Sequence, residues 1–286
     1  MSTKAKWTRF GVGIVVVLVV LAITFTFIDQ WIPTWGSTIE EQQAVYPGDE
    51  LAPDPLVNWT HGYTYRYPLD TVWPWLAQLG DTRGAFYSYT FIENMIGDTV
   101  YKNANQIIPA YQNPQPGEMI VRPLLAWKEI KTGEYLMAAD NTPDMTWTWL
   151  FSVRLEGEFT RMVVRMRIQL PDGVAGSEPV RFIMNVGGFI MEKGFIYGLR
   201  DRLNGINEPA WIEFVEIAIW FTALICGVIC AVYFIKKKDY RLPIVLGMVS
   251  IFTLMYFTFG QPAVWIRGVM DVALVALTAY MIRRTA

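Results

Sequence analysis

Four long apolar stretches stand out along the chain, one near its beginning and three near its end. The stretch from Phe10 to Ile28 holds 19 residues without a charge, and at about 1.5 Å per helical residue it spans roughly 28 Å, close to the thickness of a bilayer core. The later stretches cover 211–235, 242–260 and 264–282. The pattern predicts four transmembrane helices, and the first, at 10–28, is expected to be an uncleaved signal anchor because no small-residue cleavage site follows it.

Basic residues flank these stretches on one side only. Lys4, Lys6 and Arg9 precede the first stretch, Lys236–Arg241 joins the second to the third, and Arg283–Arg284 follows the last. Four spans place these three segments on the same side of a membrane, which the positive-inside rule makes the cytoplasmic side. We therefore expect an integral protein of the cell membrane with cytoplasmic termini and an extracytoplasmic middle segment.

Charge is distributed unevenly along the chain. Hydrophobic residues make up 53% of it and charged residues 17%, below the ~25% typical of soluble domains. Residues 29–210 hold 22 acidic and 14 basic residues, a net of −8, and the flanking segments hold the other 4 and 10, a net of +6. The basic charge sits beside the apolar stretches, so the chain has no broad basic surface for nucleic acid.

The middle of the chain has the pattern of a folded domain. Apolar and polar residues alternate from Trp147 to Leu155 and again from Arg161 to Ile168, with a turn predicted at Glu156–Glu158. Such alternation is typical of an antiparallel sheet with one face in water. We expect the inward side chains to be Trp147, Trp149, Met162, Val164 and Met166, and the side chains in water to be Arg161, Arg165 and Arg167.

Weaker patterns complete the expected α+β domain at 57–205. Residues 29–56 are rich in proline, glycine and acids without any period, so a linker is expected there. A helix at 69–79 is expected to begin with Asp70 as its N-cap. The other expected elements are strands at 60–67, 118–127 and 133–138, a short helix at 89–96 and a long apolar helix at 180–203.

Four segments of this domain resemble a known superfamily. They are VWPWLAQLGDTRGAFYSYTFIENMIG at 72–97, IIPAYQNPQPGEMI at 107–120, TRMVVRMRI at 160–168 and FIMEKGFIYGLRDR at 189–202. These segments resemble SRPBCC proteins, also called START-like, a superfamily that includes the polyketide cyclase/dehydrase type. The resemblance implies a helix-grip fold, in which an antiparallel sheet wraps around a long C-terminal helix. It also implies a cavity between them for lipids, polyketides or other hydrophobes.

The inner face of the predicted sheet offers candidates for lining such a cavity. Its tryptophans and methionines are large or adaptable apolar side chains, which are common in ligand pockets. The same residues serve equally well as plain core, and the sequence leaves both interpretations open. The candidate cavity residues are Tyr87, Tyr89, Trp127, Trp147, Trp149, Met162, Val164, Met166 and Ile190.

Few residues suggest catalysis. His61 is the single histidine, no G-x-S-x-G segment marks a nucleophile, and no cluster has the spacing of zinc ligands. If the cavity were cyclase-like, Tyr87, Tyr89 and Glu93 would be the acid–base candidates. No catalytic residue, metal site or cofactor is therefore assigned.

Charged residues occur at the outer ends of the predicted C-terminal spans. Glu213 and Glu216 lie in the opening turns of the second span, and Arg267 and Asp271 lie near the start of the fourth. Asp271 is about 10 Å deep, where an unpaired carboxylate costs on the order of 2–3 kcal/mol. We expect Arg267 to pair with Asp271, one turn away, and with Glu213 or Glu216, forming a charge clasp between two helices.

The sequence as a whole predicts a membrane-tethered START-like domain that binds a lipid or other hydrophobic ligand at the outer membrane face. Two alternatives stay open. One is a cyclase-like or lipid-modifying enzyme that uses the same cavity, and the other is an accessory or sensory subunit that pairs with another membrane protein through its helices.

Overall fold

The chain folds into two compact units. Phe27–Asn207 form one, called the sheet unit below, and Met1–Thr26 with Glu208–Ala286 form the other, called the helical unit. The computed structural model describes residues 3–96, 100–140, 145–170, 178–237 and 239–285. Lys238, part of the basic segment between two predicted spans, lies outside these residues.

The sheet unit is built on six antiparallel strands in the order β1-β6-β5-β4-β3-β2. The first strand therefore pairs with the last, and the other strands follow as neighbours in sequence. This arrangement confirms the predicted α+β class with an antiparallel sheet. The strands are β1 (Val57–Tyr65), β2 (Met119–Val121), β3 (Leu125–Lys131), β4 (Tyr135–Asp140), β5 (Thr146–Glu156) and β6 (Phe159–Gln169).

The β5–β6 hairpin sets which side chains face the core. Glu156 pairs with Phe159, so the turn holds two residues, and Gly157 adopts a φ of +66° that glycine accommodates without strain. Period-two alternation then turns one whole set of side chains inward. The expected inward residues are confirmed: Trp149, Met162, Val164 and Met166 belong to the core cluster, and Trp147 packs against it.

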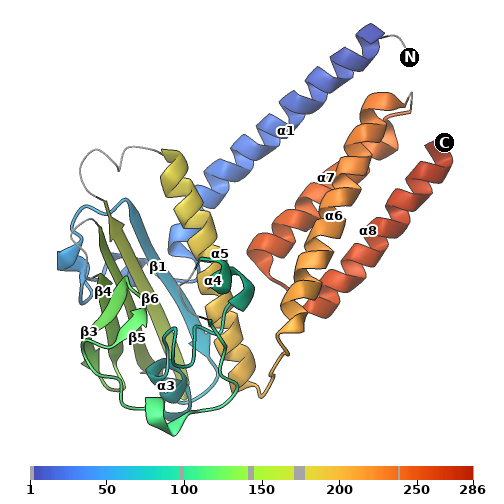
Figure 1. Cartoon of the computed structure of the whole chain (residues 1–286). Helices are drawn as coiled ribbons and strands as arrows, with labels where there is room; N and C mark the ends of the chain where they lie inside the picture. Colours follow the sequence, from blue (N-terminus) through green and yellow to red (C-terminus); the bar gives the residue numbers. More distant parts are fainter. Residues whose placement is uncertain (1–2, 97–99, 141–144, 171–177, 238, 286) are drawn as a thin grey trace. The chain divides into compact units, whose positions relative to one another are not determined.

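A long helix, α5 (Glu178–Leu203), lies across the inner face of the sheet (Figure 1). Its buried residues Phe195, Ile196 and Leu199 join the core that the strands line. This confirms the helix-grip arrangement. Two short helices, α3 (Leu69–Ala77) and α4 (Thr90–Ile96), and the turn η3 (Pro109–Tyr111) complete this side of the unit.

The expected N-cap of α3 is wrong by two residues. Pro68 takes the cap position without a side-chain hydrogen bond, and Asp70 lies in the first turn of the helix. Proline fixes its own φ near the value seen here, −67°, so the helix can begin directly after it. The Asp70 carboxylate still favours the helix start through the helix dipole.

The outer face of the sheet departs most from expectation. Arg161 and Arg165 were expected in water, yet their exposed fractions are only 8% and 6%. The segment expected to be a linker covers them, and it contains the turns η1 (Ile32–Thr34) and η2 (Asp49–Leu51) and the helix α2 (Ile39–Gln43). The prediction failed because alternation shows that a face is polar but not whether another segment covers it.

Matched carboxylates hold this covering segment in place. Two N–H groups on one edge of the Arg161 guanidinium donate to Glu41, with Nε–Oε1 at 2.9 Å and Nη2–Oε2 at 2.6 Å. Arg165 donates to Asp49 at 3.0 and 3.1 Å and to the Thr60 hydroxyl at 2.5 Å. Paired, hydrogen-bonded charges of this kind are the form in which buried ions are tolerated.

Arg167, also expected in water, is half-buried under the same segment. Its Nη1 donates to the carbonyl oxygens of Asp49 and Ala52, at 2.8 and 3.0 Å. These bonds fix the end of the covering segment just before β1 begins at Val57. All three strand arginines therefore serve the packing of the outer face.

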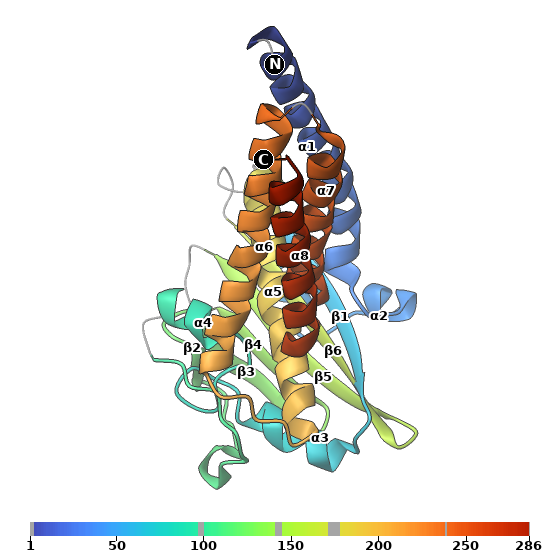
Figure 2. The same cartoon turned by 90° about the vertical axis from the view of Figure 1, so that its right-hand side faces the viewer.

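The helical unit contains the last three apolar segments and the first one as far as Thr26. Within the described residues, four helices are long and apolar enough to cross a membrane, as their length and composition predict. Figure 2 shows α6, α7 and α8 running side by side, and buried side chains of all three pack together around Cys226 and Leu274. The helices are α1 (Thr3–Trp31), α6 (Trp211–Lys236), α7 (Arg241–Met255) with a π-helical end η4 (Tyr256–Gly260), and α8 (Val264–Thr285).

Candidate functional site

A cavity of about 620 Å³ lies between the inner face of the sheet and α5. The strands β1, β5 and β6 form one wall, α5 forms the opposite wall, and the segments around Phe86 and Val121–Leu124 close its sides. Most of the lining is aromatic or aliphatic, and Glu93, Arg122 and Glu192 are the charged residues that contribute to it. The volume and lining are those of a site for a mostly apolar small molecule.

Two adjacent glycines of α5 shape this cavity. A Cβ at Gly188 would lie 1.9 Å from Cη2 of Trp59, so only glycine lets the helix approach β1 this closely. Gly187 lines the cavity, and a Cβ there would meet no atom of the described residues within 4 Å. Close packing against Trp59 therefore requires glycine at position 188, although a glycine in a helix interior costs roughly 1 kcal/mol relative to alanine.

Four of the nine candidate cavity residues line this cavity. Trp147 and Trp149 come from β5, Met166 from β6 and Ile190 from α5. The rings of Trp147 and Trp149 stack at 6.2 Å between centroids and form a continuous aromatic wall. Their indole Nε1 atoms have no hydrogen-bond partner among the described residues.

The other five candidates lie elsewhere in the sheet unit. Met162, Val164 and Trp127 are fully buried in the core cluster. The hydroxyl of Tyr87 donates to the Trp75 carbonyl at 2.8 Å, and burial raises the pKa of this phenol above its usual range. Tyr89 packs beside Gly194 of α5. The structure therefore places the three acid–base candidates in different surroundings, with only Glu93 on the cavity wall.

The sequence reasoning missed a buried carboxylate on the cavity wall. Glu192 lies on α5 with an exposed fraction of 3%, and its Oε1 contacts Nδ1 of His61 on β1. Nε2 of His61 lies 2.6 Å from the carbonyl oxygen of Ile32 in η1. The second carboxylate oxygen, Oε2, has no hydrogen-bond partner among the described residues.

A sequence signal for Glu192 did exist. Position 192 falls three residues after Phe189 and four before Ile196, both of which are buried, so it lies on the apolar face of α5. A carboxylate on such a face requires a partner. The single histidine of the chain is the obvious candidate, although its position on a distant strand hid the pairing.

The neighbouring Lys193 occupies an aromatic surrounding instead. Its Nζ lies 4.9 Å from the ring centroid of Trp35 and 5.2 Å from that of Tyr197, within cation–π range. Burial of the ammonium group lowers the pKa of Lys193 to about 8. Consecutive residues of α5 thus place one charge beside the cavity and the other among aromatic rings.

The helical unit brings together two of the four clasp candidates. Nη2 of Arg267 lies 3.1 Å from Oε1 of Glu216, which joins α8 to α6. The Arg267 Nε also donates to the Pro262 carbonyl at 2.7 Å. Asp271 is buried, and its Oδ1 has no hydrogen-bond partner among the described residues. Glu213 lies in the first turn of α6.

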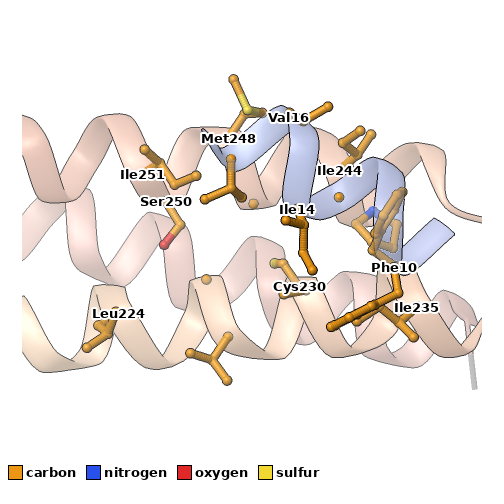
Figure 3. Close-up of a pocket in the computed structure, with 18 of the residues that line it drawn as sticks. Phe10, Ile14, Val16, Leu224, Cys230, Ile235, Ile244, Met248, Ser250 and Ile251 are labelled. Carbon is orange, nitrogen blue, oxygen red and sulfur yellow. The ribbon is translucent and has the colours of Figure 1, made fainter. Parts of the chain in front are cut away.

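A second hollow, of about 520 Å³, lies within the helical unit. Figure 3 shows Phe10 and Ile14 of α1 on one side of it, with Cys230 of α6 and Met248 of α7 nearby. Its lining is apolar except for Ser250, whose hydroxyl donates to the Ala223 carbonyl at 2.6 Å. Hydrocarbon of any kind would fill such a hollow, so its lining selects no particular ligand.

No group of three or more potential metal ligands occurs within the described ranges. No protein-family model matches the sequence, and no curated protein matches it either. Three solved structures show how far the similarity of the chain to known proteins extends.

The first is protein MLL2253 from Mesorhizobium loti, at 14% identity over 53% of this chain and 99% of that one, with a TM-score of 0.33. CalU16 from Micromonospora echinospora shows 12% identity over 54% and 79%, with a TM-score of 0.31. Protein NE0264 from Nitrosomonas europaea shows 13% identity over 52% and 95%, with a TM-score of 0.33. These TM-scores are too low to support an argument about fold. The description of the fold above therefore rests on the strand order and on the position of α5.

Proposed function

We propose that the sheet unit is a START-like domain that holds a lipid or another small hydrophobic molecule between its sheet and α5. One observation carries this proposal, namely the cavity of about 620 Å³ walled by Trp147, Trp149 and Met166. Ligand sites typically enclose about 300–1,000 Å³ and are lined mainly by apolar and aromatic side chains. The resemblance to SRPBCC proteins noted from the sequence implies a cavity at the same place.

We further propose that four membrane-spanning helices carry this domain at the outer face of the cell membrane. Four described helices have the required length and apolar composition. The basic residues that flank them support cytoplasmic termini through the positive-inside rule. A ligand-binding domain held beside a bilayer has access to molecules that dissolve poorly in water.

The ligand-binding proposal is tested by native mass spectrometry of the full-length chain released from detergent. We expect a co-purified hydrophobic molecule on the wild-type protein. Trp149→Ala should reduce its retention about tenfold or more, because a buried aromatic contact contributes on the order of 1.5–3 kcal/mol. Trp211→Ala, which removes an indole that is 60% exposed, is the matched control and should leave retention unchanged.

Two results would contradict the proposal. One is a wild-type protein that never retains a hydrophobic molecule, even after incubation with a lipid extract. The other is equal retention by the Trp149→Ala and Trp211→Ala variants. In either case the aromatic wall is better described as core.

A further inference from the structure

The Glu192–His61 pair defines the chemistry of one point on the cavity wall. The Ile32 carbonyl can only accept a hydrogen bond, so Nε2 of His61 must carry a proton to bond with it. Nδ1 then either carries a second proton that it donates to the Glu192 carboxylate, or accepts the proton of a neutral Glu192 carboxyl. Both arrangements place one proton between Nδ1 and Oε1, and both leave the pair with no net charge.

The second oxygen of Glu192 is an acceptor in both arrangements. Oε2 carries no proton in either of them, it is buried, and it has no partner among the described residues. A buried acceptor without a hydrogen-bond partner is energetically unfavourable. Because Glu192 lines the cavity, a bound molecule with a hydrogen-bond donor can satisfy this oxygen.

The opposite wall offers donors. Nε1 of Trp147 and Nε1 of Trp149 are buried and have no partner among the described residues, although both side chains line the cavity. An indole N–H can donate but cannot accept. The polar inventory of the cavity therefore includes a buried acceptor on α5 and two donors on β5, within a lining that is otherwise mostly apolar.

We propose, on the basis of the ligand-binding function above, that the cavity takes a hydrophobic molecule bearing a hydroxyl group that donates to Glu192. A hydroxyl group both donates and accepts, so it matches the acceptor of Glu192 and the donors of the tryptophans. A carboxylate, as in a fatty acid, only accepts and gives Oε2 no partner. The bond to Oε2 of Glu192 is thereby available to long-chain alcohols and not to carboxylates or ethers of the same length.

The test compares 1-dodecanol with its methyl ether, which keeps the oxygen but lacks the donor. Both are radiolabelled and titrated against the full-length protein in lipid nanodiscs, with empty nanodiscs measuring partition into the lipid. We expect wild-type protein to bind the alcohol about tenfold or more tightly than the ether, a difference of about 1.4 kcal/mol, since the ether leaves the buried Oε2 without a donor.

Two variants assign this preference to Glu192. Glu192→Met fills similar space without an acceptor and should bind the two molecules equally. Glu192→Gln can donate its amide N–H to Nδ1 of neutral His61 and keep its oxygen as the acceptor, so it should retain the preference. Because the preference is a ratio within one variant, binding of the ether shows at the same time that the cavity is intact.

The outcomes separate this inference from the function on which it rests. Equal binding of alcohol and ether by the wild type would overturn the hydroxyl preference and leave hydrophobic binding standing. Tighter binding of dodecanoate or dodecylamine than of dodecanol would also overturn it, in favour of an acid or an amine. Wild-type protein that binds none of these probes above the empty nanodiscs would overturn both proposals.

Discussion

The sheet unit and the helical unit both bury arginine–carboxylate pairs, and they support them differently. In the sheet unit Nε and Nη2 of Arg165 donate to Asp49, and Nη1 donates to the Thr60 hydroxyl. In the helical unit Arg267 contacts the Glu216 carboxylate and donates one bond to the backbone carbonyl of Pro262. The first arrangement holds the covering segment of residues 29–56, called the strap below, over the sheet, and the second joins two helices.

The difference shows how much each pair depends on its surroundings. Burying two charges costs several kcal/mol per ion, and attraction repays this only when further hydrogen bonds satisfy both partners. The pairs of the sheet unit meet this condition with several bonds each. Arg267 makes fewer such bonds to the described residues than Arg165 does, so removing Arg267 should disturb its unit less.

The largest effect is expected for Arg165→Ala. This change leaves the Asp49 carboxylate buried without its main partner, which should lower the free energy of unfolding of the sheet unit by about 3–5 kcal/mol. Denaturant titration of the full-length protein, followed by tryptophan fluorescence, measures it. The control is Lys131→Ala, which removes one partner of an exposed ion pair and should change the free energy of unfolding by no more than about 0.5 kcal/mol. Equal denaturant midpoints for the two variants would show that Arg165 does not hold the strap against the sheet.

A second effect is the loss of stability at low pH that follows protonation of the Glu41 carboxylate. Burial alone would raise its pKa, but hydrogen bonds from Arg161, the Thr38 backbone and Arg154 outweigh burial and lower the pKa to about 2 from 4.5. The unfolded chain therefore takes up this proton first as the pH falls. The stabilisation is complete above about pH 4.5 and decreases towards pH 2, by on the order of 3 kcal/mol in total.

Glu41→Gln isolates this contribution. Unfolding midpoints measured at intervals from pH 7 to pH 2 should show the wild type more stable at neutral pH and the two proteins converging in acid. A gap between them that stays constant over this range would mean that the Glu41 carboxylate is not the titrating group.

The smallest effect is expected in the helical unit. Arg267→Ala should destabilise the bundle in detergent by about 1–2 kcal/mol, near the upper end measured for polar contacts between membrane helices. Lys237→Ala serves as the control at a helix end, and its melting temperature should stay closer to the wild type. Asp271→Asn should change it less than Arg267→Ala does, because the resolved partner of Arg267 is Glu216. Identical melting temperatures for the Arg267 and Lys237 variants would show that the Arg267–Glu216 pair does not stabilise the helical bundle.

Periodicity was sufficient to predict much of the framework. The alternation around Trp149 and Met166 gave the hairpin and the inner face, because a sheet residue has only two sides to occupy. The apolar stretches predicted the four long helices, because an uncharged run of about 20 residues has the length of a membrane-spanning helix. The charges within α6 and α8 were noticed because charge is unusual in an apolar stretch.

The arginine layer and the cavity carboxylate needed three-dimensional information. A charged residue such as Arg161 is ordinary on a strand whose outer face meets water. The sequence of the strand therefore does not show that another segment covers this face. Glu192 and His61 pair across 131 positions of sequence, and no local pattern records such a distance. Trp127 was assigned to the cavity for its size, but size does not tell a pocket wall from a core.

The strap over the sheet also imposes an order on biosynthesis. Glu41 leaves the ribosome 120 residues before Arg161, its main partner, and β1 must likewise wait for β6. At about 5–20 residues per second, the two acids of the strap spend roughly 6–24 seconds without their arginines. During that interval the first apolar segment is already made and the last three are not. A nascent chain truncated before β6 should therefore remain open to proteases, and one in which both β6 and α5 (Glu178–Leu203) have left the ribosome should become resistant.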